Sequence, residues 1–269
     1  MSSESPRELA PGMYWLEECG PDRSHFLDGR TPSWITPEQE MHIPQNAYLV
    51  RDDRSLLFDT LSPASTDRIL TDLELLLEGE SLDYLVVSHP DVPHAGNTLP
   101  ILEAHPEATL VAPGYGTGHE LYHLEDAMHV TEGDEIDLGE YTVAFHEATF
   151  PDAAVHVWMS ETKTGTLFPV DWFGYPHTSA ECSRFADEFE HPLTVDRLVE
   201  YHGRVLFWFQ YVDVPTVHEA IDEVIARIEP SIIAPGHGNV IREDVDEAVA
   251  MAKEAVEHVR TGGRVGTLG

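Results

Sequence analysis

The chain has 269 residues, 42% of them hydrophobic, which is enough to bury a sizeable core in one large domain or two small ones. Its formal net charge of −34 excludes nucleic acid as a partner, because such an acidic surface repels phosphates. No stretch is apolar enough to span a membrane, and residues 1–7 lack the pattern of a secretory signal, so we expect a cytoplasmic protein without a membrane partner.

The acidic residues are spread along the chain rather than gathered in one tail, and only Lys163 and Lys253 are lysines. Self-repulsion of this kind destabilises a compact chain in dilute buffer. Multimolar salt removes that penalty, because the Debye length falls to about 3 Å at 1 M salt. The composition is typical of proteins from halophiles that accumulate salt, so we expect a halophilic protein.

Cys19 and Cys182 are the only two cysteines, and they are far apart in the sequence. They lack the close spacing of a thiolate metal site, and a single distant pair does not indicate a disulfide framework. We therefore expect two free thiols.

The first half of the chain is predicted to contain five strands and two helices. The predicted strands are residues 13–16, 47–50, 55–58, 85–87 and 109–112. Ser62 followed by Pro63 starts a helix that Gly79 ends, and a second helix runs to about residue 105. Residues 1–40 are otherwise irregular. The glycine-rich residues 114–118 lack the lysine of a phosphate-binding loop.

From residue 127 the pattern changes to short, mostly antiparallel strands, and helices follow. The predicted strands are residues 128–130, 141–145, 155–159, 167–170 and 231–234. The predicted helices are residues 179–189, 194–209, 214–228 and 243–259. Two blocks of strands, each followed by helices, predict two sheets packed face to face with helices outside. The expected architecture is thus a four-layer αββα sandwich, formed as a single domain over residues 1–269.

Histidines and carboxylates follow the ends of three predicted strands. The buried strand 85–87 leads into a loop that carries His89, Asp91 and His94, while Asp171 and His237 follow two later strands. Open α/β sheets place their chemistry at strand ends, so these five side chains could share one cleft. Imidazole and carboxylate are ligands for zinc, iron or manganese.

The chain resembles the metallo-β-lactamase fold and, within it, the diiron domain of flavodiiron proteins. The resemblance covers nearly the whole chain from about residue 41. It is carried by the motifs at residues 46–50, 57–60, 87–97, 133–139, 150–152, 167–174 and 234–238. In flavodiiron proteins the ligand loop has the form His-x-Glu-x-Asp-His. Three further residues complete the family's metal-ligand set. They are a third His before an aromatic-Pro-Asp segment, a bridging Asp before Phe-Gly and a last His before Gly.

The resemblance assigns His89, His94 and His237 as ligands, with Asp171 as the bridging carboxylate and Asp91 in place of the glutamate. Two family ligands are missing, because Pro93 occupies the Asp position and Thr149 the third His position. We therefore expect one divalent metal ion, iron or zinc, with two ions left open as the alternative.

Other side chains are candidates for supporting roles at this site. Three histidines could substitute for a lost ligand: His146, His156 and His42. Asp59 ends a strand, where it either orients the ligand loop by hydrogen bonds or simply caps the strand.

The resemblance implies reduction of dioxygen or nitric oxide with electrons from FMN in a flavodoxin domain. We expect no flavodoxin domain here and no FMN bound by the chain itself. A separate flavodoxin-like or rubredoxin-like electron donor would then be needed, unless the domain is a gas sensor. The resemblance also suggests a homodimer. Two alternatives remain open: a metal-dependent hydrolase of an ester, thioester or lactam, and a degenerate, non-catalytic member of the fold.

Overall fold

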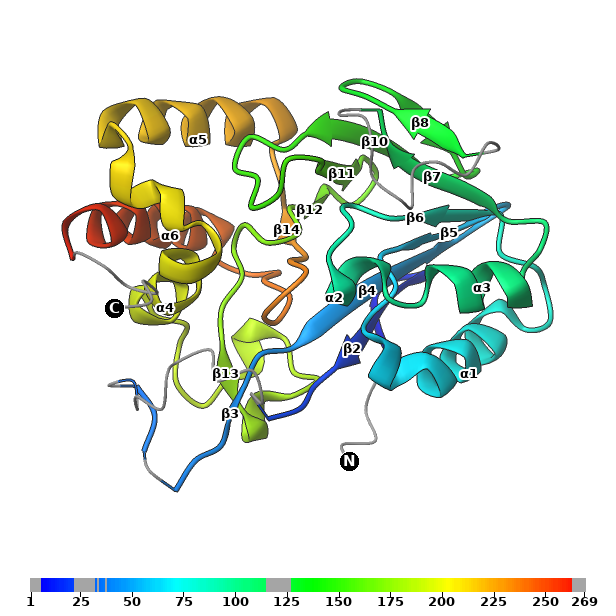
Figure 1. The fold of residues 1–269 in the computed structure, drawn as a ribbon, viewed down its shortest axis with the longest axis horizontal. Helices are drawn as coiled ribbons and strands as arrows, with labels where there is room; N and C mark the ends of the chain where they lie inside the picture. Colours follow the sequence, from blue (N-terminus) through cyan, green and yellow to red (C-terminus); the bar gives the residue numbers. More distant parts are fainter. Residues whose placement is uncertain (1–5, 22–31, 33, 37, 115–126, 263–269) are drawn as a thin grey trace. The chain divides into compact units, whose positions relative to one another are not determined.

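The computed structural model describes residues 6–21, 32, 34–36, 38–114 and 127–262 (Figure 1). It divides into two compact units. Unit 1 comprises Met1–Glu18, Gln45–Ala148 and Ala153–Thr164, and unit 2 comprises Cys19–Pro44, Thr149–Asp152 and Gly165–Gly269. In the described part of the chain no helix has the length and apolar character needed to cross a bilayer. Most of the glycine-rich segment 114–118 lies outside the described residues.

Unit 1 is built on a seven-stranded mixed sheet with the order β1-β2-β4-β5-β6-β7-β8. Its strands are β1 (Arg7–Ala10), β2 (Met13–Glu18), β4 (Gln45–Arg51), β5 (Ser55–Phe58), β6 (Tyr84–Val86), β7 (Thr109–Pro113) and β8 (Met128–Val130). The pairs from β1 to β5 are antiparallel, and those from β5 to β8 are parallel. The five strands predicted for the first half of the chain are confirmed. Strand β1 was not predicted, and β8 is a parallel edge strand rather than part of an antiparallel stretch.

Short helices in unit 1 follow the sheet strands. They are η1 (Pro63–Ser65), α1 (Thr66–Leu77), α2 (Val92–Ala95) and α3 (Thr98–Ala104). The predicted helix start is confirmed, because the Ser62 side chain accepts a hydrogen bond from the backbone of Ala64 at 3.3 Å. Helix α1 buries Ile69, Leu73 and Leu77 at helical spacing. Each such side chain contributes about 1.5–3 kcal/mol through burial.

Three more strands of unit 1 form an antiparallel ladder with β10 in the middle. They are β9 (Glu135–Asp137), β10 (Thr142–Glu147) and β11 (Val157–Glu161). In this ladder Phe145 lies opposite Met159, and Val143 lies opposite Ile136. The antiparallel pairing predicted for this part of the chain is confirmed.

Unit 2 contains the two longest helices of the described residues, α5 and α6, and two short strand pairs. Its helical segments are η3 (Ser179–Glu181), η4 (Ala186–Glu188), α4 (Val195–Val205), η5 (Phe207–Tyr211), α5 (Val214–Ile228) and α6 (Val245–Thr261). The strand pairs are β12 (Thr166–Phe168) with β14 (Ile232–Ile233), which are parallel, and β3 (Met41–His42) with β13 (His177–Thr178), which are antiparallel. The predicted helices near 194–209, 214–228 and 243–259 are confirmed.

The predicted helix over residues 179–189 is wrong, because only the two 3-10 turns form there. Cys182 has an extended ψ of 136°, and Ser183 has a φ of +55°, so a helix cannot continue through them. The turn before them is fixed by Glu181, whose side chain accepts from the backbone of Thr178 at 2.7 Å and from both Arg197 guanidinium nitrogens at 2.9 and 3.0 Å. Although burial raises the pKa of Glu181, these hydrogen bonds hold it below its usual value.

Cys19 and Cys182 are joined by a disulfide across 163 residues, so the expectation of two free thiols is wrong. The pairing of β3 with β13, together with a bridge between Pro21 and His42, places these distant segments beside each other. His177 lies next to the disulfide and is fully buried. Burial lowers the pKa of His177 to about 4, although its hydrogen bond with Asn239 acts in the opposite direction.

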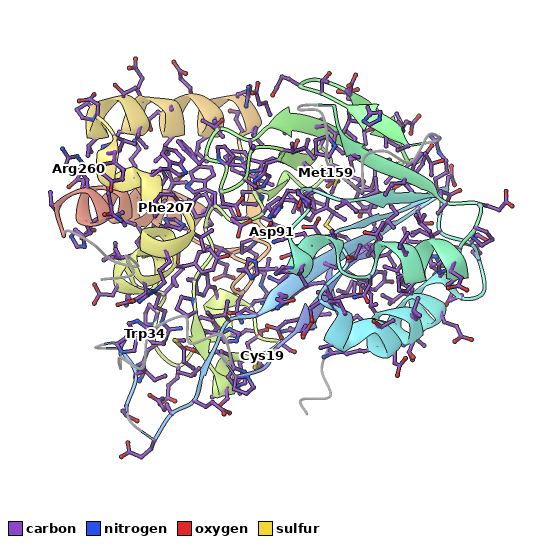
Figure 2. The ribbon with its side chains drawn as sticks, in the orientation of Figure 1. Cys19, Trp34, Asp91, Met159, Phe207 and Arg260 are labelled. Carbon is purple, nitrogen blue, oxygen red and sulfur yellow. A yellow bond between two sulfur atoms is a disulfide. The ribbon has the colours of Figure 1, made fainter. Side chains whose placement is uncertain are left out.

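Acidic side chains line the exposed faces of helices in both units. Oxygen-tipped side chains project outward along α1 and α5 in Figure 2. Glu74 in α1 and Glu219, Asp222 and Glu223 in α5 are all exposed. The dispersed acid is consistent with the halophilic composition, but dependence of stability on salt stays a prediction.

His202 in α4 is a buried imidazole without charge. Its ring centroid lies 6.1 Å from that of Phe209 and 6.4 Å from that of Tyr201. Neither ring nitrogen has a hydrogen-bond partner among the described residues, and burial lowers the pKa of His202 to about 3. The imidazole therefore stays neutral in the folded protein, whereas the unfolded chain takes up a proton near pH 6.5.

Replacing His202 with leucine should make the protein less sensitive to mild acid. The pKa of His202 is lower in the folded state than in the unfolded state. Below pH 6.5 protonation therefore stabilises the unfolded chain, and the free energy of unfolding falls as the pH falls towards 3. Between pH 7.5 and 5.5 this loss is about 1.4 kcal/mol, and it should be missing from His202→Leu. Denaturant unfolding at the two pH values measures it. His191→Leu, at an exposed histidine, is the control, and equal pH dependence in all three proteins would contradict the argument.

Candidate metal centre

The predicted ligand loop in unit 1 begins where strand β6 ends. His89 follows the strand, Asp91 is the N-cap of the short helix α2, and His94 lies within that helix. Gly96 cannot be replaced without distortion, because a Cβ there would lie 2.6 Å from Pro63. The Asn97 side-chain amide donates to two carbonyls of the preceding turn, those of residues 60 and 62, at 2.7 and 2.8 Å. The loop is therefore held against the turn that follows β5.

Asp59 is the hydrogen-bond acceptor at the centre of that turn. Its carboxylate accepts from the Ser88 backbone at 2.9 Å, from the Ser88 hydroxyl at 3.0 Å and from His94 Nδ1 at 2.7 Å. Asp59 has a φ of +63°, a conformation that costs a non-glycine residue of the order of 1–2 kcal/mol. Strained backbone of this kind is concentrated at functional sites, where the surrounding contacts hold it in place.

These contacts assign the tautomers of His89 and His94. A carboxylate only accepts, so His94 donates through Nδ1 and carries its lone pair on Nε2. The Ser88 hydroxyl donates to Asp59 and so accepts from His89 Nδ1 at 3.1 Å. His89 likewise carries its lone pair on Nε2. Metal-binding histidines have the same arrangement, in which one nitrogen donates to the protein and the other is the ligand atom.

His156 and Asp91 lie beside His89 in the same unit. The rings of His89 and His156 are stacked with centroids 4.5 Å apart, and those of His89 and His94 are 4.2 Å apart. His89 and His156 each offer a nitrogen within 4.8 Å of the other. The Asp91 carboxylate is 4.0 Å from His89 Nε2, and its side chain is 62% exposed. Unit 1 thus brings three imidazoles close together, with one exposed carboxylate beside His89.

The other two candidate substitutes are held in other contacts. His146 Nε2 lies 2.8 Å from the Ser160 hydroxyl, and its Nδ1 lies 3.3 Å from Glu132. His42 belongs to unit 2, where its Nδ1 lies 3.2 Å from the sulfurs of both Cys19 and Cys182. Of the three candidates, only His156 is stacked on a predicted ligand.

In unit 2 the predicted ligands Asp171 and His237 lie close together. His237 Nε2 is 3.6 Å from Asp171 Oδ1, and both residues are buried. His237 Nδ1 donates to the Pro44 carbonyl at 2.7 Å, which again leaves the lone pair on Nε2. Tyr201 donates its hydroxyl proton to Asp171 Oδ1 at 2.6 Å. The imidazole lone pair therefore faces a carboxylate oxygen, an arrangement that a cation would stabilise.

The loop that carries Asp171 is strained on both sides of it. Val170 has a φ of +55° and Phe173 one of +66°, and for a β-branched valine this value is a clear outlier. The Gly236 backbone N–H donates to the Val170 carbonyl at 2.6 Å, which ties this loop to the segment that precedes His237. A Cβ at Gly174 would lie 2.4 Å from the Tyr201 ring. Glycine at this position therefore allows Tyr201 to reach Asp171.

Asp152 is a candidate ligand that the sequence analysis did not name. In unit 2 one of its carboxylate oxygens lies within 4.8 Å of one from Asp171. The neighbouring residues are fixed, because Trp208 donates to the Pro151 carbonyl at 2.9 Å and Phe150 packs on Trp172 with centroids 4.8 Å apart. The sequence could have indicated Asp152, because it ends the aromatic-Pro-Asp motif that follows Thr149, the residue matched to the third family histidine.

Each unit therefore carries part of the predicted ligand set. Unit 1 brings together His89, Asp91 and His94 and adds His156, while unit 2 brings together Asp171 and His237 and adds Asp152. The assignment of Pro93 and Thr149 to lost ligand positions stays a prediction. Pro93 lies in the first turn of α2 without a side-chain donor, and Thr149 precedes Phe150.

The family model of the metallo-beta-lactamase superfamily matches residues 42–180, which is more than half of the chain. The chain belongs to this superfamily. The rubredoxin-oxygen oxidoreductase of Megalodesulfovibrio gigas is 28% identical over 221 residues, which cover 79% of this chain and 52% of that protein. The nitric oxide reductase of Moorella thermoacetica is 27% identical over 245 residues, which cover 89% and 58%.

Among solved structures, the rubredoxin oxygen:oxidoreductase of Desulfovibrio gigas matches with a TM-score of 0.75 and 23% identity. The match covers 94% of this chain and 62% of that one. The predicted mixed α/β class of the metallo-β-lactamase fold is confirmed. The predicted resemblance to flavodiiron proteins is also confirmed, by the two curated relatives above together with solved flavodiiron proteins that share the fold. The chain spans about half the length of the curated relatives that it matches.

Replacing Asp59 with asparagine should weaken metal binding without unfolding the chain. An amide of the same shape must direct its NH₂ group either at His94 Nδ1–H or at the Ser88 N–H, so it cannot satisfy both. We expect His94 to change tautomer and the metal affinity to fall by about 10–100-fold. Competition with a chelator measures the affinity. Asp67→Asn, on the exposed face of α1, should bind as the wild type does, and equal affinity in Asp59→Asn would refute the assignment.

Proposed function

We propose that the predicted ligand set binds one divalent metal ion, and that the ion is iron. The set consists of His89, Asp91, His94, Asp171 and His237. The observation that carries this proposal is shared by the three histidines. In each of them Nδ1 donates to an acceptor of its own unit, at 3.1, 2.7 and 2.7 Å, so that Nε2 is presented as a ligand atom.

The donor atoms fit iron. Two imidazoles and one carboxylate, from His94, His237 and Asp171, are the combination that holds non-haem iron in facial triads. His156 and Asp152 supply further nitrogen and oxygen donors beside His89 and Asp171. We propose that they partly compensate for the ligands lost at Pro93 and Thr149.

The chain is, on this proposal, a flavodiiron-like domain that acts on dioxygen or nitric oxide, as an oxidoreductase or as a sensor. The names of its relatives support these gases, since one is a rubredoxin-oxygen oxidoreductase and another a nitric oxide reductase. Bound iron would supply a redox centre with positions open to a small ligand. The Tyr201 hydroxyl donates to Asp171 Oδ1 at 2.6 Å, which fixes the orientation of the carboxylate that would hold the ion.

Electrons would come from a separate donor of the rubredoxin or flavodoxin type. The name of the relative from Megalodesulfovibrio gigas supports a rubredoxin. We also propose that the protein forms a homodimer, on the family resemblance alone.

Metal analysis of protein purified without oxygen in high salt tests the proposal. We expect one iron per chain, with an optical and paramagnetic resonance spectrum that changes when nitric oxide is added. Asp171→Ala and His237→Ala should each abolish metal binding, while His129→Ala, at an exposed position, should not. Bound zinc with turnover of a chromogenic ester or thioester would indicate a hydrolase instead. Absence of any bound metal would indicate a non-catalytic member of the fold.

Restoring the two lost ligands should raise the metal content. We expect Pro93→Asp combined with Thr149→His to increase the stoichiometry from about one towards two metal ions per chain, because each substitution returns an ionisable or imidazole donor to its family position. Mass spectrometry of the intact holoprotein counts the ions. Pro93→Ala combined with Thr149→Ala is the matched control. If the repaired variant still binds one ion, the matching of these two positions to the family motif is wrong.

A further inference from the structure

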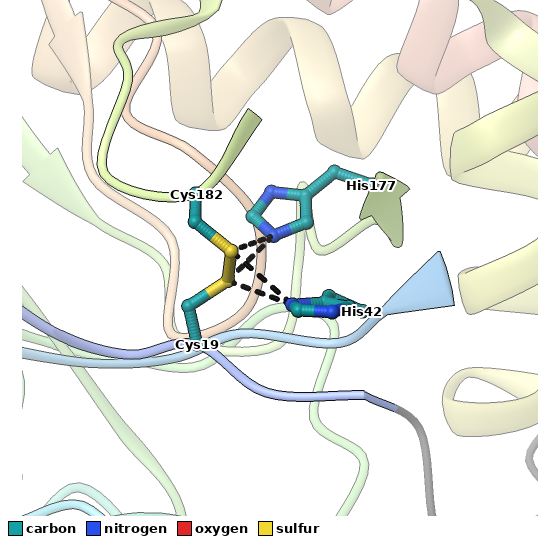
Figure 3. A group of neighbouring side chains, drawn as sticks. All are labelled: Cys19, His42, His177 and Cys182. Carbon is teal, nitrogen blue, oxygen red and sulfur yellow. Dashed lines mark hydrogen bonds between the residues drawn. A yellow bond between two sulfur atoms is a disulfide. The ribbon is translucent and has the colours of Figure 1, made fainter. Parts of the chain in front are cut away.

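A second group of potential ligands lies entirely within unit 2. It consists of Cys19, His42, His177 and Cys182, and each residue offers one ligand atom within 4.8 Å of all the others. Figure 3 shows both imidazole rings directed at the two sulfurs. His42 Nδ1 is 3.2 Å from each sulfur, and His177 Nε2 is 3.1 Å from Cys19 Sγ and 3.8 Å from Cys182 Sγ.

Asn239 fixes the tautomer of His177. Its Nδ2 donates to the carbonyls of Glu181 and Arg184, both at 2.7 Å, so its Oδ1 must be the atom that faces His177. That oxygen accepts from His177 Nδ1 at 2.5 Å. His177 therefore presents the lone pair of Nε2 to the sulfurs. Asn239 and His177 are both fully buried, so solvent does not alter this arrangement.

His42 has the same arrangement with its nitrogens exchanged. Its Nε2 lies 3.3 Å from the Glu40 carboxylate, which only accepts, so Nε2 carries the proton and Nδ1 the lone pair. Two imidazole lone pairs thus converge on two sulfurs. In a disulfide neither sulfur carries a proton, so the sulfurs cannot donate to these nitrogens. Cross-linking the chain requires only the two cysteines and does not explain why two buried imidazoles are directed at the bond.

We propose that Cys19, His42, His177 and Cys182 form a tetrahedral zinc site when the disulfide is reduced. Two thiolates and two neutral imidazoles are a set that selects zinc. The oxygen acceptors behind both rings, Glu40 and Asn239, are the outer partners that orient metal-binding histidines. The site is separate from the proposed iron centre and shares no residue with it.

The distances between these atoms suit a zinc ion. With Zn–S of about 2.3 Å and Zn–N of about 2.0–2.1 Å, tetrahedral geometry places neighbouring nitrogen and sulfur atoms about 3.6 Å apart. The four such distances here run from 3.1 to 3.8 Å. The imidazoles are therefore already close to their liganding positions. Only the sulfurs have to separate, to about 3.8 Å.

The two forms interconvert by a two-electron step. A dithiol reductant converts the disulfide to two thiols and becomes a disulfide itself. Zinc then binds both sulfurs as thiolates and displaces two protons. In the reverse direction, hydrogen peroxide and two protons accept the two electrons of the thiolates, so that the disulfide, a free zinc ion and two water molecules are formed.

Cobalt(II) substitution tests the proposal, because the two cysteines are the only ones in the sequence. The full chain is reduced with a phosphine under argon in high salt and titrated with Co²⁺. We expect one Co²⁺ per chain to bind with thiolate-to-cobalt charge-transfer absorption in the near ultraviolet and the intense visible bands of tetrahedral cobalt, in addition to any ion held at the proposed iron centre. Zinc should displace it. Protein that has not been reduced should show neither signal, and Asp171→Ala, which affects only the proposed iron centre, should keep both.

Variants of the four residues make the test specific. Cys19→Ser should remove about half of the charge-transfer intensity and weaken cobalt binding at least tenfold. His42→Asn should also weaken cobalt binding, but it should keep the full charge-transfer intensity per bound ion. In the wild type, zinc should protect both thiols from alkylation, a readout that needs no variant. Two outcomes would overturn the proposal and leave the pair as a structural disulfide. In the first, reduced wild-type protein binds cobalt without charge-transfer absorption. In the second, its thiols react equally fast with and without zinc.

Discussion

The carboxylate of Asp59 is the acceptor on which the ligand loop of unit 1 depends. Its three hydrogen bonds, at 2.7, 2.9 and 3.0 Å, set the position of Ser88 and the tautomer of His94, and Ser88 sets the tautomer of His89. Three donors on one buried carboxylate also offset the strain of its positive φ. In unit 2 the backbone carbonyl of Pro44 accepts from His237 Nδ1 and sets the tautomer of that histidine in the same way. In both units an acceptor behind the ring therefore fixes the tautomer of the histidines that are predicted to be ligands.

Hydrophobic patterning predicted most of the elements that carry these residues. The strand that precedes His89 and the helices near 66, 195, 214 and 245 have apolar spacing that a sequence shows directly. The helix expected over residues 179–189 failed for a local reason, the positive φ of Ser183, which periodicity cannot reveal. Strand β8 was assigned to the wrong pairing because parallel and antiparallel edge strands of three residues have the same pattern.

The contacts that the sequence could not predict join distant residues. Cys19 and Cys182 are 163 residues apart, and only the pairing of β3 with β13 brings them together. The stacking of His156 on His89 was equally hidden, since His156 lies in a different predicted strand, residues 155–159. Asp152 could have been predicted, because it is the last residue of the aromatic-Pro-Asp motif at residues 150–152. Residue type and local spacing thus gave the candidates, and tertiary contacts decided among them.

Two sets of donors with different chemistry are present in one chain. The set around Asp171 and His237 offers oxygen and imidazole nitrogen, which suit iron in its divalent state, whereas the set around Cys19 and Cys182 offers sulfur and nitrogen, which suit zinc. Zinc binds most sites more tightly than ferrous iron does, so an oxygen and nitrogen site alone does not exclude it. Reduced thiolates would compete for zinc strongly, because soft sulfur donors favour it. Under reducing conditions, which also keep iron divalent, the sulfur set would therefore take zinc away from the site proposed for iron.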